Sequence, residues 1–204
     1  MGERSLRLCI LLATLVVPSC SGVGYPLHHY AEVYTRSELY IPPPAAEHVS
    51  QEVERGRYLV QLTGCGACHT DGALIGEPNA ARLLAGSDIG IAYTDPLSEA
   101  RPGVAYPPNL TPAPKTGLGG WSDENVVAAI RSGGHGRSGR LTVMPWAFYR
   151  QMTDQDASAI VAYLRSIPPV EHAVPSRVAP GSPAPAAYVY FGVYRSGPSV
   201  HSGP

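Results

Sequence analysis

The sequence predicts an all-α domain of three main helices and long loops. Apolar side chains recur at helical spacing in residues 49–63, 123–132 and 154–166. Residues 70–121 are rich in glycine and proline and show only a weak apolar period. So long a stretch without regular structure is uncommon in a compact domain. A large buried cofactor would give these residues a core to surround.

Composition supports one loop-rich domain with tails. The chain has 204 residues, 22 glycines and 21 prolines, and charged residues make up only 15% of it. Its formal net charge is −1, so no basic excess favours nucleic acid, and no such partner is expected.

Residues 1–20 have the pattern of a signal peptide. Arg4 and Arg7 precede a short apolar run at residues 8–17, about half the length of a membrane-spanning helix. A small residue then precedes Cys20, as in a bacterial lipobox, so we expect export to the periplasm and a lipid anchor on Cys20. Pro18 departs from that pattern, and ordinary cleavage that releases a soluble protein is the alternative.

Two further segments flank the predicted domain, which covers residues 49–170. Residues 21–48 are rich in tyrosine and end near a triple proline at 42–44, which predicts a semi-rigid spacer or a disordered segment. Residues 171–204 are rich in Pro, Ala and Ser and predict a flexible tail, although the apolar patch at 188–194 could pack on the domain or on a partner.

Capping residues support each helix. Ser50 is a plausible N-cap of the first, Ser122 of the second, and Thr153 of the third. The first helix contains Gly56, which costs up to about 1 kcal/mol relative to alanine in a helix interior. Such a glycine suggests that another helix crosses closely there.

The strongest motif is Cys65-Gly66-Ala67-Cys68-His69, which immediately follows the first helix. Two thiols separated by two residues can add to the two vinyl groups of one haem, and the adjacent imidazole can then bind the iron. Cys9 lies inside the predicted signal and Cys20 at its end, so no cysteine remains for a structural disulfide, and a haem c would supply the cohesion instead.

Three other interpretations of the motif are weaker. A zinc site would need a second pair of Cys or His ligands at similar spacing, and the sequence has none. A thioredoxin-like disulfide would need a preceding strand, whereas this motif follows a predicted helix. Chance occurrence of the pattern is the remaining alternative.

Met144 is the expected second axial ligand. It lies in a loop stiffened by Pro145, whereas Met152 precedes a helix in ordinary apolar surroundings. A His–Met pair raises the reduction potential and leaves no open site, which suits electron transfer. A lone methionine can also be core filler, and His135 is a weaker alternative ligand.

Residues 50–170 resemble a class I monohaem cytochrome c domain. The resemblance rests on "GRYLVQLTGCGACHT", "AYPPNLTPAPKTGLGGWSDENVVAAIRSG" and "MPWAFYRQMTDQDASAIVAYLRSIPPV". More narrowly, these segments are similar to the membrane-associated cytochrome domains that accompany alcohol and related dehydrogenases in bacteria. The resemblance implies that the N-terminal helix crosses the C-terminal one, with Gly56 and Tyr58 near Tyr163. It also implies haem propionates near three further residues, Tyr106, Asn109 and Trp121.

The expected function is single-electron transfer without substrate turnover. The chain has one CxxCH where many of those relatives carry several, so it is expected to relay electrons between separate proteins, with no internal chain of haems. Expected partners are a donor dehydrogenase and an acceptor oxidase or cytochrome. A haem enzyme or gas sensor with an open sixth site, or a structural module of a larger complex, are the alternatives. Arg131, Arg137 and Arg140 precede the Met144 loop and could dock an acidic partner, neutralise propionates or be merely solvated.

Overall fold

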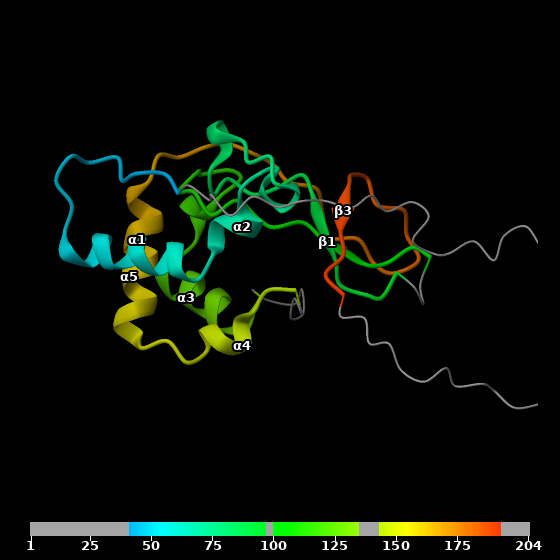
Figure 1. Ribbon diagram of the computed structural model, residues 1–204. Helices are drawn as coiled ribbons and strands as arrows, with labels where there is room; N and C mark the ends of the chain where they lie inside the picture. Colours follow the sequence, from blue (N-terminus) through cyan, green and yellow to red (C-terminus); the bar gives the residue numbers. More distant parts are fainter. Residues whose placement is uncertain (1–40, 97–99, 135–142, 193–204) are drawn as a thin grey trace, which may run out of the picture.

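The computed structural model describes residues 41–96, 100–134 and 143–192 (Figure 1). The described part is mainly helical with a small sheet. Its α-helices are α1 (Gln51–Leu62), α2 (Cys65–His69), α3 (Asp123–Ser132), α4 (Trp146–Tyr149) and α5 (Asp154–Ser166). The three helices expected from the sequence correspond to α1, α3 and α5, while the short helices α2 and α4 were not predicted.

Helices α1 and α5 lie side by side and form the largest helix contact of the fold (Figure 1). An ideal Cβ on Gly56 would lie 1.8 Å from the carbonyl oxygen of Ala159 and 2.8 Å from Cβ of Tyr163. Only a residue without a side chain allows this approach, so the expected close crossing at Gly56 is confirmed. Tyr58, expected near Tyr163, is 61% exposed.

The predicted N-caps are confirmed by hydrogen bonds to the first helical turns. The Ser50 hydroxyl accepts from the Val53 amide at 3.2 Å, and the Ser122 hydroxyl from the third residue of α3 at 3.3 Å. The Thr153 hydroxyl accepts from the Asp156 amide at 3.1 Å. Each bond satisfies an amide that the helix itself leaves unpaired.

Residues 70–121 contain more regular structure than their composition predicts. They form three short 3-10 helices, η1 (Ala73–Ile75), η2 (Ala80–Arg82) and η3 (Leu118–Gly120), and two strands, β1 (Gly90–Ala92) and β2 (Val104–Ala105). The strands pair antiparallel and are buried on both faces. Strands of two or three residues are too short to show an alternation of apolar and polar side chains, so the sequence did not predict them.

The C-terminal segment differs from the predicted flexible tail over residues 171–192. Strand β3 (Tyr188–Val189) pairs parallel with β1 and completes a sheet of order β2-β1-β3. Val178 is buried with Val104 and Tyr106 in a small apolar cluster. These backbone pairings and apolar contacts hold a segment whose Pro and Ser content alone predicts mobility. Residues 193–204 lie outside the described residues.

The end of the predicted linker also contacts the domain. The Tyr163 hydroxyl of α5 donates to the carbonyl oxygen of Pro42 at 2.6 Å, and the Ala45 amide donates to that of Ser166 at 2.7 Å. The remainder of the linker and the predicted signal peptide, including Cys20, lie outside the described residues.

The main core is made by helices α1, α3 and α5 together with Leu84 and Leu118 from the long connection. This core therefore joins the helices to the loops that surround the cavity described next. Within the described residues, no helix is both long and apolar enough to cross a membrane.

Candidate functional site

The residues of the CxxCH motif converge with Met144 on one cavity. Cys65, Cys68 and His69 from α2 line it, and so does Met144 from the segment that precedes α4. The cavity is thus lined by two segments, α2 and the residues just before α4, that are about 75 residues apart in sequence. Its volume is about 290 Å³, and apolar side chains from α3 and α5 supply much of its wall.

Helix α2 is set at an angle to α1 by a left-handed turn at Gly64, with φ of 68°. Glycine adopts this conformation without the steric cost that a Cβ brings. The Thr63 hydroxyl donates to the carbonyl oxygen of Leu59 at 2.7 Å and lies 3.3 Å from the Cys65 sulfur. Residues between the helices therefore direct the first thiol of the motif.

Burial favours the protonated form of both thiols of the motif. Cys65 and Cys68 form no disulfide. Burial raises the pKa of each thiol above its usual value, and for Cys68 the neighbouring Cys65 adds to the effect. The sulfurs are therefore two neutral nucleophile precursors held on one helical turn and facing the same cavity.

The ring of His69 is fixed as a neutral imidazole. Its Nδ1 donates to the carbonyl oxygen of Pro108 at 2.8 Å, which leaves the lone pair on Nε2. Burial lowers the pKa of His69, with the bond to Pro108 acting in the opposite direction. A neutral imidazole with one ring nitrogen occupied by a carbonyl is the form in which histidine binds metals.

Asn109 secures the loop that carries this carbonyl. Its side-chain amide nitrogen donates to Val170 O at 2.7 Å and to the Thr116 hydroxyl at 3.2 Å. Its side-chain oxygen accepts from the Thr111 amide at 2.9 Å and from the Thr111 hydroxyl at 2.8 Å. These bonds tie the loop to the segment after α5 and so fix its position beside His69.

The three residues expected near propionates all line the cavity. Both side-chain N–H groups of Asn109 are already used within the protein, so none is left to donate to a carboxylate of a ligand. The hydroxyl of Tyr106 likewise donates to Ala186 O at 3.0 Å. The backbone carbonyl of Trp121 accepts a hydrogen bond from the guanidinium group of Arg165. Asn109 and Tyr106 therefore brace the cavity wall.

Met144 and Met152 both line the cavity, although only Met144 was expected to. They differ in their surroundings. Met152 packs against the main core cluster, and its carbonyl accepts from Arg131 at 2.8 Å. Arg131 also pairs with Asp154 at 2.8 Å, so it holds α3 to the start of α5 and is not simply a solvated cation. His135, Arg137 and Arg140 lie outside the described residues.

No role was predicted from the sequence for Tyr149, which lines the cavity, or for His172, and both join segments remote in the chain. The Tyr149 hydroxyl donates to Thr63 O at 2.9 Å and so ties α4 to the turn before the motif, and burial raises its pKa to about 12. His172 is buried, its Nδ1 donating to Ala85 O at 2.9 Å. Tyr149 lies within a segment quoted above, but no pattern indicates its role or that of His172, because both donate to backbone carbonyls remote in sequence.

Comparison with known proteins places this geometry in a family. A family model described as cytochrome c matches residues 53–168, more than half of the chain. The fructose dehydrogenase cytochrome subunit of Gluconobacter japonicus is 38% identical over 118 residues, covering 56% of this chain and 22% of that protein. The alcohol dehydrogenase (quinone) cytochrome c subunit of Gluconacetobacter polyoxogenes is 34% identical over 137 residues, covering 64% and 27%.

A third relative is the gluconate 2-dehydrogenase cytochrome c subunit of Pantoea cypripedii, 31% identical over 123 residues, covering 59% of this chain and 24% of that protein. The chain thus spans about a quarter of the length of each of these three relatives.

Proposed function

Because the chain belongs to the cytochrome c family, whose members carry covalently attached haem, we propose that it is a single-electron carrier with one haem c. The observation that carries the proposal is the convergence of two free thiols, a neutral imidazole and a thioether on one largely apolar cavity. No substrate-transforming residue is required for this role.

The donor set fits a covalently attached haem. Cys65 and Cys68 would hold it through two thioethers, since both sulfurs lie on one turn of α2 and face the cavity. Gly66 is buried and Ala67 is small, so little side-chain bulk stands between the helix backbone and the cofactor edge. Apolar walls from α3 and α5 would cover the macrocycle and exclude water.

His69 and Met144 are the proposed axial ligands. The bond from His69 Nδ1 to Pro108 O orients the ring and leaves Nε2 as the ligand atom. Met144 is favoured over Met152 because Met152 packs into the main core cluster, from which Met144 is absent. When bound, the haem supplies one-electron chemistry, its iron passing between ferric and ferrous forms.

The cellular setting is part of the proposal. The signal-like residues 1–20 favour export to the periplasm, and the lipobox-like Cys20 favours a lipid anchor. The relatives described above are named as cytochrome subunits of fructose, alcohol and gluconate dehydrogenases. By analogy, a dehydrogenase would be the electron donor, and an oxidase or another cytochrome the acceptor.

The test is the ferric spectrum of protein matured in an exporting host. Met-to-iron coordination gives a weak near-infrared band. We expect this band in the unaltered protein, its loss in Met144→Ala and its retention in the matched variant Met152→Ala. Mass spectrometry of the same material reports haem addition and acylation together.

Other outcomes would change the proposal. A high-spin ferric spectrum with rapid binding of external ligands would favour a haem enzyme or gas sensor. If Met152→Ala lost the band and Met144→Ala kept it, Met152 would be the axial ligand in place of Met144. Colourless, correctly processed protein with free thiols would refute electron transfer by this chain altogether.

A further inference from the structure

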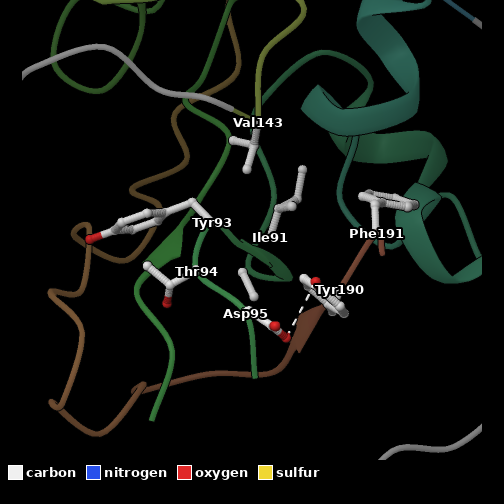
Figure 2. A pocket seen from close by; sticks show the side chains of 8 residues that line it. Ile91, Tyr93, Thr94, Asp95, Val143, Tyr190 and Phe191 are labelled. Carbon is white, nitrogen blue, oxygen red and sulfur yellow. Dashed lines mark hydrogen bonds between the residues drawn. The ribbon is translucent and has the colours of Figure 1, made fainter. Parts of the chain in front are cut away.

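A second pocket lies beside the cavity of the CxxCH motif, at the C-terminal ends of β1 and β3 (Figure 2). Its volume is about 350 Å³, within the range of small-ligand and side-chain sites. The lining comes from β1 and the residues after it, from the segment before α4 and from the residues after β3: Ile91, Ala92, Tyr93, Thr94, Asp95, Val143, Tyr190 and Phe191.

The two cavities share part of a wall. Ile91 and Val143 line both of them, and Val143 immediately precedes the proposed ligand Met144. A group seated in the second pocket would therefore be separated from the haem cavity by two aliphatic side chains. This position matters for electron transfer, because tunnelling is fast only over short distances.

The chemistry of the lining suits a cation on an aliphatic stem. Asp95 is the one charged residue among the described residues that line the pocket, and it accepts a hydrogen bond from the Tyr190 hydroxyl at 3.5 Å. Figure 2 shows Asp95 and the rings of Tyr190 and Phe191 around one side of the pocket, with Ile91 and Val143 on another. Carboxylates and aromatic faces attract ammonium groups, and aliphatic walls accept methylene chains.

We propose that this pocket receives a lysine side chain of a protein redox partner, and so seats the partner next to the haem cavity. The inference rests on the proposed electron-transfer function. A protein side chain is favoured over a free metal ion, because the pocket combines a single carboxylate with apolar walls. Phe191 is 66% exposed, and a docked partner would bury its ring.

The first experiment titrates the reduced holoprotein with n-butylammonium, which reproduces the end of a lysine side chain, at constant ionic strength. Saturable NMR shifts are expected at Asp95, Tyr190 and Phe191. Because exposed cation–π and ion-pair contacts are weak, Asp95→Asn and Phe191→Leu should each weaken binding about threefold. Glu52→Gln removes the same charge from the first turn of α1, outside the pocket, and should leave binding unchanged.

The second experiment measures electron transfer to mitochondrial cytochrome c, a lysine-rich probe, and to ferricyanide, an anionic one. Asp95→Asn should slow transfer to the lysine-rich protein about threefold and not slow transfer to ferricyanide. Glu52→Gln should alter neither rate by as much.

Three results would overturn the proposal: no saturable shift, equal shifts with neutral n-butanol, or an Asp95→Asn rate equal to that of the unaltered protein. Haem-loaded protein that reduces ferricyanide but does not bind butylammonium would refute this inference alone. Protein that binds butylammonium but carries no haem would refute the proposed function instead.

Discussion

Replacing Gly56 with alanine sets two opposed effects against each other. Alanine is favoured over glycine in a helix interior by about 1 kcal/mol, so helix propensity alone predicts a more stable protein. The new Cβ, however, would lie 1.8 Å from the carbonyl oxygen of Ala159 and 2.5 Å from its carbonyl carbon. These are backbone atoms of α5, which cannot rotate away as a flexible side chain could.

The steric cost should outweigh the gain in helix propensity. To bring the Cβ to an acceptable distance, α1 must withdraw from α5 by about 1 Å or more, which loosens the largest helix contact of the fold. Overpacking of this kind costs about 3 kcal/mol at the upper end of its usual range. After subtraction of the propensity gain, Gly56→Ala should destabilise the protein by about 2 kcal/mol, or about 4–8 °C in Tm.

Thermal unfolding of the haem-loaded protein, followed by far-UV circular dichroism, measures this effect. Ser158→Ala is the matched control: it introduces the same residue at an exposed position of α5 and should leave Tm unchanged or slightly higher. If Gly56→Ala unfolded at or above the temperature of the unaltered protein, the close crossing of α1 and α5 would be refuted.

Two further predictions concern the loop beside the histidine and the surface of α1. Asn109→Ala removes a hydrogen-bond partner of the buried Thr111 amide and of Val170 O. The free energy of unfolding, measured in guanidinium, should therefore fall by about 2–4 kcal/mol. An unchanged unfolding midpoint would contradict the bracing role of Asn109. The hydrogen bond from Arg55 lowers the pKa of Asp156. The ionised carboxylate therefore stabilises the fold above its unfolded pKa of about 4, and this contribution is lost as pH falls through the lower folded pKa. Asp156→Asn should flatten the acid limb of a stability-against-pH curve, and a limb identical to that of the unaltered protein would show that the pair contributes nothing.

The sequence predicted those parts of the fold that depend on local interactions. The helical periods and the caps Ser50, Ser122 and Thr153 involve residues within a few positions of one another, so their pattern is legible without tertiary information. The CxxCH motif is equally local, because its two thiols and its imidazole lie on a single turn of helix, from which they would meet one cofactor. Gly56 indicated a close helix approach because a glycine there is otherwise costly.

Tertiary structure alone decided what depends on remote contacts. The ordering of the residues after α5 comes from pairing with β1 and from bonds such as those of Asn109 to Val170 and of His172 to Ala85. Composition describes how a free segment behaves, and it carries no information about backbone partners that lie about 60 to 100 residues away. For the same reason the sequence could identify Asn109 as a residue of the site but not its role. The hydrogen-bonding capacity of its side chain is consumed by the fold that holds His69, and only the folded chain shows where that capacity is used.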